Sequence, residues 1–141
     1  MAKNFIPALR FKSLNVLFDR FLKVSMKENH IRNELINFSE LSNNQTILDF
    51  GCGTGTLIKM ILEKVPGLNI VGLDIDRNIL DLAAFKLKTS NPQLVEYDGV
   101  KIPFSDGYFD KVLTSLAIHH IESKNKLLKT IKYHCCPVKL V

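Results

Sequence analysis

The sequence is poor in the residues that mark several large classes of protein. Its 141 residues include no tryptophan and only three cysteines, of which two are adjacent, and this count disfavours a disulfide framework. No apolar run approaches the roughly 20 residues that cross a bilayer, so we expect no integral membrane segment. The first residues lack the apolar core of a secretory signal, which favours a cytoplasmic location.

The basic excess lies at the two ends of the sequence. The net charge is +5, divided as +3 over residues 1–45, −2 over residues 46–120 and +4 over residues 121–141. A nucleic-acid-binding domain concentrates such charge on its binding face, so we expect no nucleic-acid partner. The run His134, Cys135 and Cys136 fits no zinc-ligand spacing, and we expect no metal.

The pattern of apolar residues changes near residue 45. Over residues 5–40 apolar side chains recur every three or four positions, which predicts helix, with one face formed by Leu14, Leu17, Phe18, Phe21 and Leu22 and continued by Ile31, Leu35, Ile36 and Phe38. A polar break follows at residues 42–44. We therefore predict a helical N-terminal extension over residues 1–45 and one core domain over residues 46–141.

Strands and helices are predicted to alternate after the break. We expect strands at residues 46–50, 69–73, 93–97 and 109–116, and helices at 56–65 and from a cap at Asp76 through Leu87 to a stop at Asn91-Pro92. A last helix would begin at Ser123. This alternation predicts an α/β fold, a Rossmann-like, doubly wound parallel sheet whose ligands bind at the carboxyl ends of the strands.

A glycine-rich turn follows the first predicted strand. Residues 49–55 read Asp-Phe-Gly-Cys-Gly-Thr-Gly, and glycines here let the backbone turn tightly and approach a ligand closely. Asp74 ends the next strand, 23 positions after Gly51, where a carboxylate can accept the hydroxyls of a ribose. The combination indicates a cofactor that contains adenosine.

The spacing of the glycines distinguishes a site for a dinucleotide such as NAD from a site for another cofactor that contains adenosine. A dinucleotide site has Gly-x-Gly-x-x-Gly or Ala, whereas here the third position is Thr56 and Gly55 comes one residue early. Asp49 also precedes the first glycine by two residues. S-adenosylmethionine (SAM) carries a cationic sulfonium and an ammonium group that favour nearby carboxylates. SAM is therefore preferred, and an NAD-binding oxidoreductase is the less favoured alternative.

Four segments together resemble class I SAM-dependent methyltransferases: residues 46–55, 71–76, 97–110 and 113–120. They stand in the order of that family's motifs. Residues 1–45 resemble, much less specifically, the lid of family members that act on small molecules, such as those of quinone biosynthesis. The resemblance implies methyl transfer from SAM to a small-molecule acceptor.

The resemblance also assigns roles to individual residues. Asp49 would hold the amino group of SAM, Asp74 the ribose hydroxyls and Asp98 the adenine amino group. The other implied cofactor-binding residues line the methionine or adenine parts of the site: Gly51, Cys52, Gly53, Gly55, Ile75, Gly99 and Ser115. A second interpretation of Asp98 is a turn residue before Gly99.

The end of the fourth predicted strand bears on the acceptor. Family members that methylate the amino nitrogens of adenine or glutamine carry Pro-Pro-aromatic there, whereas this chain has Ser-Leu-Ala at 115–117, which disfavours those substrates. His119 and His120 follow and are the candidate catalytic residues, because a histidine can orient or deprotonate an acceptor hydroxyl near neutral pH. Alternatively, they are loop histidines without chemistry.

The last ten residues depart from the family. Where relatives continue with a Lys-Pro-Gly-Gly-like turn and further strands, residues 132–141 read Lys-Tyr-His-Cys-Cys-Pro-Val-Lys-Leu-Val. From the sequence we therefore expect a core truncated after the fourth strand and its helix, with that strand as an exposed edge. A non-catalytic remnant is the resulting alternative. A further one is weak membrane-surface contact through the basic, Phe-rich N-terminal helix.

Overall fold

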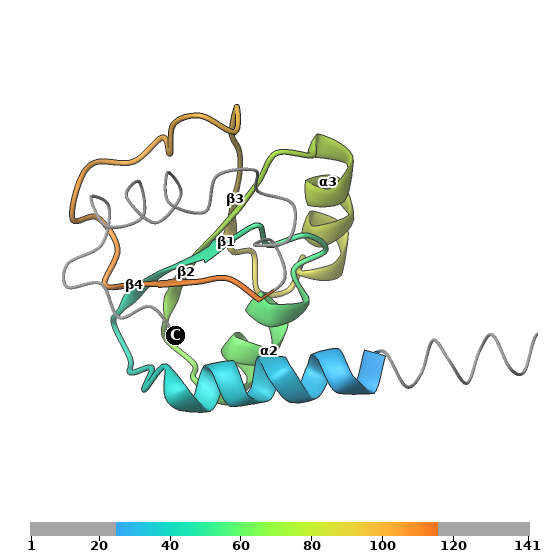
Figure 1. The fold of residues 1–141 in the computed structure, drawn as a ribbon, viewed down its shortest axis with the longest axis vertical. Helices are drawn as coiled ribbons and strands as arrows, with labels where there is room; N and C mark the ends of the chain where they lie inside the picture. Colours follow the sequence, from blue (N-terminus) through green and yellow to red (C-terminus); the bar gives the residue numbers. More distant parts are fainter. Residues whose placement is uncertain (1–24, 116–141) are drawn as a thin grey trace, which may run out of the picture.

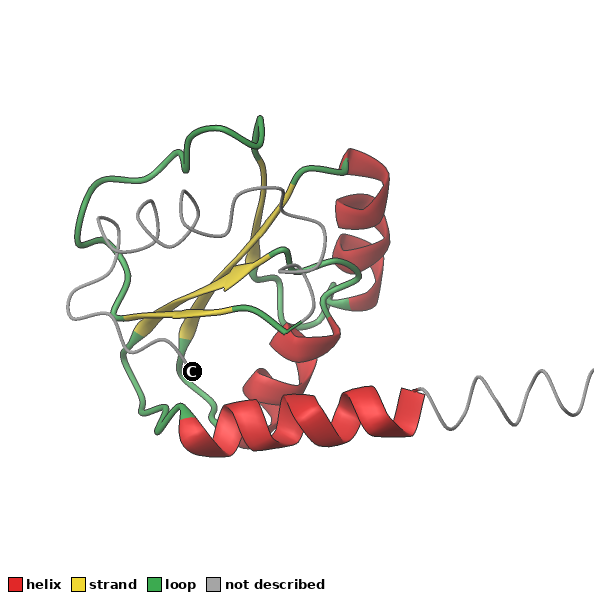
Figure 2. Ribbon diagram, in the orientation of Figure 1, coloured by secondary structure: helices red, strands yellow, loops and turns green. Residues whose placement is uncertain are grey.

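The computed structural model describes residues 25–115, which form a four-stranded parallel sheet with its helices (Figures 1 and 2). Residues 25–38 are helical and are called helix 25–38 below. The elements that follow are β1 (Thr46–Phe50), α2 (Thr56–Lys64), β2 (Asn69–Asp74), α3 (Arg77–Lys86), β3 (Gln93–Glu96) and β4 (Lys111–Leu113). The predicted α/β class and parallel sheet are confirmed.

The strand order reverses once in the described sheet. The order is β3-β2-β1-β4, so the chain moves outward from β1 to β3 and then returns to the other side of β1. Right-handed crossovers put α2 and α3 on one face, whereas the connection between β3 and β4 packs on the opposite face. The reversal lies between β1 and β4, and such a switch point is where parallel sheets bind ligands.

Each face of the sheet has its own apolar core. On the helical face, Ile47 packs with residues of α2, α3 and helix 25–38. On the other face, Leu48 and Phe50 pack with Ile102 and Phe109. Because side chains alternate along a strand, Asp49 shares the helical face with Ile47.

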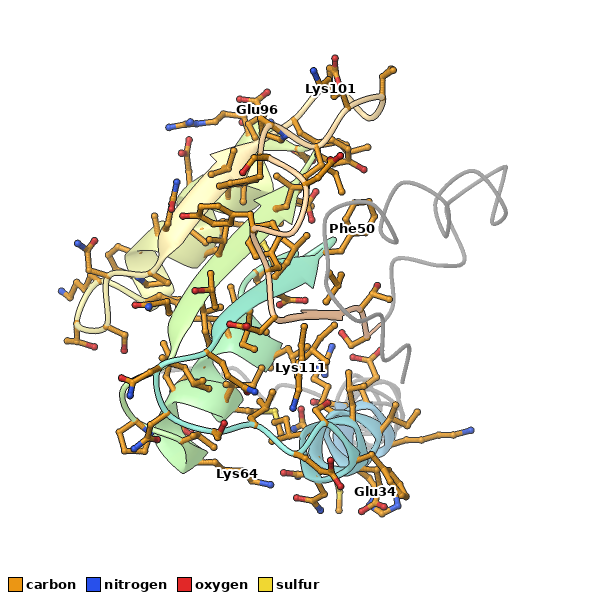
Figure 3. The ribbon with its side chains drawn as sticks, turned by 90° about the vertical axis from the view of Figure 1, so that its left-hand side faces the viewer. Glu34, Phe50, Lys64, Glu96, Lys101 and Lys111 are labelled. Carbon is orange, nitrogen blue, oxygen red and sulfur yellow. The ribbon has the colours of Figure 1, made fainter. Side chains whose placement is uncertain are left out.

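Helix 25–38 packs on the sheet through part of its predicted apolar face. Leu35 and Ile36 are buried in the core, whereas Ile31 and Phe38 are exposed. The Lys111 side chain of β4 lies close to helix 25–38 (Figure 3). Its ammonium donates to the backbone carbonyls that follow the helix, Ser39 O at 2.5 Å and Glu40 O at 2.6 Å. A cation at a helix C-terminus also interacts favourably with the helix dipole.

Three predicted boundaries were wrong by two residues or more. Helix α3 ends at Lys86 rather than at Asn91-Pro92, because the Leu87 carbonyl accepts from Ser90 N–H and Asn91 N–H and so closes a turn. Strand β4 begins at Lys111 rather than at residue 109 because the Asp110 carboxylate, and not a backbone carbonyl, accepts the Thr46 N–H at 2.7 Å. Strand β4 also ends at Leu113 rather than at residue 116, since residues 114 and 115 are described and lie outside the strand. The helix predicted after Ser123 lies outside the described residues.

Gly72 occupies a crowded position on the helical face. In the ladder Asp49 pairs with Gly72, which pairs with Leu94. A Cβ at Gly72 would lie 2.7 Å from Ile58 Cδ1, 2.8 Å from Leu94 Cδ2 and 2.9 Å from Cys52 Sγ. At those distances the neighbouring side chains would have to shift, so the absence of a side chain at Gly72 lets α2 and the glycine-rich turn approach β2.

We expect Gly72→Ala to lower the free energy of unfolding by about 1–3 kcal/mol, the usual effect of overpacking a core. Urea denaturation followed by circular dichroism measures it. In an Ile58→Val background, which removes the Cδ1 atom, the alanine should cost less, since contacting sites are not additive. An equal loss in both backgrounds would contradict this account of the packing.

Candidate functional site

The loops after β1, β2 and β3 meet at the carboxyl edge of the sheet. The Leu73 carbonyl accepts from Gly51 N–H at 2.8 Å and from Cys52 N–H at 3.0 Å, and the Asp74 carbonyl accepts from Tyr97 N–H at 3.1 Å. These backbone bonds fix the three loops against one another. The structure thereby brings most of the predicted site residues together at the edge where the strand order reverses.

The glycine-rich turn has the backbone that its composition predicts. Gly51, Gly53 and Gly55 have φ angles of 70°, 53° and 72°, a region that other residues rarely adopt. A Cβ at Gly55 would lie 2.6 Å from Leu87 Cδ1, so this glycine lets α3 pack against the turn. Nothing lies within 4 Å of a Cβ placed at Gly53, where the turn faces open space that a ligand can enter.

Asp74 joins the turn to the end of β2. Its Oδ2 accepts from Gly53 N–H at 2.8 Å, and its Oδ1 accepts from Asp76 N–H at 3.2 Å. Each carboxylate oxygen has two lone pairs, so acceptor capacity remains for further donors. A partly exposed carboxylate with such fixed partners can accept hydroxyl groups in a defined orientation.

Asp49 is the most unusual residue of the site. It is 1% exposed, and neither carboxylate oxygen has a hydrogen-bond partner among the described residues. Burial raises the pKa of Asp49 to about 7; the positive charge of Arg32 opposes the rise, and the negative charge of Asp74 adds to it. Buried carboxylates are ordinarily paired, so this one indicates a missing cationic or hydrogen-bonding partner.

Ile75 and Gly99 lie next to each other beyond β2 and β3. Ile75 is 62% exposed, which is unusual for isoleucine, and its Cγ2 lies 3.8 Å from a Cβ placed at Gly99. Asp98 Oδ1 accepts from Val100 N–H at 2.8 Å and from Lys101 N–H at 2.9 Å, and these bonds lower the pKa of Asp98. Asp98 is therefore a turn residue, as the second interpretation predicted. Both of these hydrogen bonds use Oδ1, so the exposed Oδ2 can accept from a ligand.

The remaining predicted residues differ in how far they can be described. Cys52 is buried, and burial raises the pKa of its thiol, so it is a packing residue rather than a nucleophile. Ser115 follows β4, whose Leu113 pairs with Asp49. The candidate catalytic residues His119 and His120 lie outside the described residues.

The described chain outside this edge holds no metal cluster and no membrane-spanning helix, but it does form a cavity. Residues 25–115 contain no group of three His, Cys, Asp or Glu side chains that could hold a metal ion. Within these residues, none of the helices combines the length and the hydropathy of a membrane span. A cavity of about 340 Å3 lies at the opposite edge of the sheet, where β1, β2 and β3 begin, and contains none of the predicted residues.

Arg32 of helix 25–38 was not among the residues predicted from the sequence. Its side chain is only 12% exposed, and its charge acts on Asp49 and on Lys86. The sequence does contain a signal, since Arg32 lies three and four positions before the buried Leu35 and Ile36. A charged residue on the apolar face of a helix marks a position that packing alone does not explain.

Comparison with known proteins identifies the family. A model of the family described as "Methyltransferase domain" matches residues 47–137, which is more than half of the chain. The chain belongs to this methyltransferase family. The predicted resemblance to class I SAM-dependent methyltransferases is thereby confirmed, and SAM is the cofactor of the family.

Individual relatives agree with this assignment. The chain is 34% identical over 89 residues to a demethylmenaquinone methyltransferase of Lactobacillus johnsonii and 34% identical over 97 residues to N-methyltransferase 4 of Papaver somniferum. These matches cover 60% and 66% of this chain but only 36% and 27% of the relatives, so the chain spans less than half of their length.

A solved methyltransferase structure shows the same fold. Phosphoethanolamine N-methyltransferase 2 of Haemonchus contortus, in complex with SAM, superimposes with a TM-score of 0.67 at 24% identity. The match covers 76% of this chain and 25% of that one.

We expect Asp49→Asn to stabilise the ligand-free protein above pH 7. A pKa raised from 3.8 to about 7 means that the native state binds the extra proton. The stability that it provides is complete below pH 3.8 and is lost as the pH rises through about 7. The advantage of the Asp49→Asn variant over the wild type should therefore grow from pH 5 to pH 7, to on the order of a few kcal/mol, and then level off.

Urea denaturation of both proteins between pH 5 and pH 8 measures this difference. Asp81→Asn is the matched control, because Asp81 is exposed and pairs with Arg77 on the same helix. Its effect should not vary over this range. A constant difference between Asp49→Asn and wild type would show that Asp49 titrates normally.

Proposed function

We propose that the protein binds SAM and transfers its methyl group to a small-molecule acceptor. The observation that carries the proposal is the buried Asp49 carboxylate, which has no partner among the described residues although it lies beside a glycine-rich turn that faces open space. An ammonium group of the cofactor would supply the missing partner. Family membership supports the same cofactor.

The other site residues fit the rest of SAM. Asp74 retains acceptor capacity for the ribose hydroxyls while it holds Gly53 N–H. Ile75 offers an exposed apolar surface beside Gly99 for one face of the adenine. Asp98 Oδ2 can accept from the adenine amino group, since its turn bonds use only Oδ1. The backbones of Gly51, Cys52, Gly55 and Ser115 would complete the enclosure.

The chain's contribution to methyl transfer is mainly positioning. When bound, SAM supplies an electrophilic methyl group on a sulfonium sulfur. The residues of the protein hold the reacting groups in line and close together, and such alignment supplies much of the rate of a displacement reaction. We assign to His119 or His120 the removal of the proton from an acceptor hydroxyl.

A small molecule is the acceptor that the observations favour. The relatives include enzymes named for demethylmenaquinone and for N-methylation. Ser-Leu-Ala at residues 115–117 replaces the Pro-Pro-aromatic run of enzymes that methylate adenine or glutamine nitrogens.

We also propose that residues 1–45 form an extension that covers the cofactor site in a cytoplasmic enzyme. Binding of SAM without turnover on any quinol, phenol or amine would instead favour the non-catalytic alternative.

We expect the protein to bind S-adenosylhomocysteine more tightly than NAD. We also expect Asp74→Ala to weaken the binding of S-adenosylhomocysteine by about 1–3 kcal/mol, or roughly 5- to 150-fold. The physical reason is the loss of the acceptor for the ribose hydroxyls. Isothermal titration calorimetry on the full chain measures both effects. Asp81→Ala removes an exposed carboxylate on α3 and should leave the affinity unchanged.

Two results would contradict the proposal. Equal or tighter binding of NAD would favour an oxidoreductase-type site. An unchanged affinity in folded Asp74→Ala would show that the ribose is held elsewhere.

A further inference from the structure

The cavity of about 340 Å3 lies where the first three strands begin. Thr46, Asn69 and Gln93 are the first residues of β1, β2 and β3, and all three line it. These strands are parallel, and the glycine-rich turn follows the other end of β1. The cavity is therefore separated from the glycine-rich turn by the length of the sheet. Its volume falls at the lower end of the range for small-molecule sites, roughly 300–1,000 Å3.

The wall of this cavity is partly polar but carries no charge. Among the described residues that line it there is no Asp, Glu, Lys, Arg or His. A smaller cavity of about 240 Å3 beside α2 and α3 is instead lined by Lys59, Glu63 and Lys86. The larger cavity therefore favours a neutral ligand, because a buried charge needs a counter-charge that this wall does not offer.

The apolar part of the wall can receive a flat ring. Leu68, Ile70 and Val71 are between 3% and 7% exposed, so they present a fixed apolar surface. Tyr108 adds an aromatic ring that is 46% exposed. Aromatic rings pack on such surfaces and stack on tyrosine, which favours a ligand with a ring over a flexible chain.

Three side-chain amides line the same cavity, those of Asn69, Asn91 and Gln93. None of them makes a hydrogen bond to another residue of the described range 25–115. Each amide presents a donor and an acceptor next to each other. The complementary group is a lactam, a ring N–H next to a carbonyl, since the two can exchange two parallel hydrogen bonds. Asparagine and glutamine read the edges of nucleobases by the same two-point contact.

We propose that this cavity binds the lactam edge of a neutral nucleobase, such as that of uracil or guanine. The ring would pack on the apolar wall, and the amide of Asn69 or Gln93 would exchange two hydrogen bonds with the lactam. Adenine has no N–H next to a carbonyl, so the ligand differs from the adenosine part of SAM. The inference therefore concerns a second ligand and does not rest on the proposed function.

Hydration of the amides is the competing explanation, because Asn69, Asn91 and Gln93 are all exposed. Asn91 also has a φ angle of 42°, a region that asparagine adopts more readily than most residues, so the turn after α3 accounts for it. The two explanations differ in selectivity. Hydrated amides do not distinguish a lactam from its methylated form, whereas a recognition site does.

The test compares uridine with 3-methyluridine on the full chain, because the added methyl group replaces only the ring N–H. Guanosine and 1-methylguanosine form a second pair. Isothermal titration calorimetry measures the four affinities. We expect at least one unmethylated nucleoside to bind saturably, at least about fivefold more tightly than its methylated partner, as for one lost hydrogen bond. An excess of S-adenosylhomocysteine should not displace it.

Variants of the wall identify the contact. Asn69→Leu and Gln93→Met each remove an amide from an exposed position and nearly keep its volume, and at least one should abolish the preference. Asn78→Leu makes the same change at an exposed position on α3 outside the cavity and should keep it. Asn91 is left unchanged, because leucine would be strained at its positive φ.

Four results would overturn the inference. Neither uridine nor guanosine binds saturably, or the methylated partners bind as tightly. S-adenosylhomocysteine displaces the nucleoside, which would place it at the cofactor site. Both wall variants fold and keep the full preference. The comparison of ligands on the wild-type protein decides even where a variant does not fold.

Discussion

The burial of the Asp49 carboxylate is the constraint on which the site depends. Asp49 lies on the central strand β1, where the strand order reverses, and it faces the helical side of the sheet between Leu113 and Gly72. A carboxylate without partners at such a position destabilises the protein alone. Its presence is understandable if the ligand, rather than the protein, supplies the compensating charge.

Several packing features place this carboxylate and its surroundings. Gly72 has no side chain, so α2 and Cys52 approach the sheet, and Gly55 lets α3 pack against the turn. Lys111 of β4 holds the C-terminal end of helix 25–38, whose buried face carries Arg32. Stability and function are therefore linked at this edge: the same contacts that close the core also set the charges around the ligand.

The sequence predicted the parts of the structure that depend on local patterns. Strand β1, the glycine-rich turn and the Asp76 cap of α3 follow from short motifs whose geometry is nearly independent of the rest of the chain. The start of β4 was missed because it depends on a contact between Asp110 and Thr46, which are distant in sequence. Arg32 was missed for the same reason, since its burial arises from packing between helix 25–38 and the sheet. His119 and His120 remain predictions.

The ionisation of Asp49 in the presence and absence of ligand tests the central claim most directly. NMR titration of its side-chain carboxyl carbon, in protein labelled with 13C at aspartate and assigned with Asp49→Asn, reports the pKa of this one group. We expect a pKa of about 7 for Asp49 in the ligand-free protein and a marked fall of this pKa with saturating S-adenosylhomocysteine, because the ammonium stabilises the carboxylate. A normal pKa without ligand, or a pKa that the ligand does not change, would contradict it.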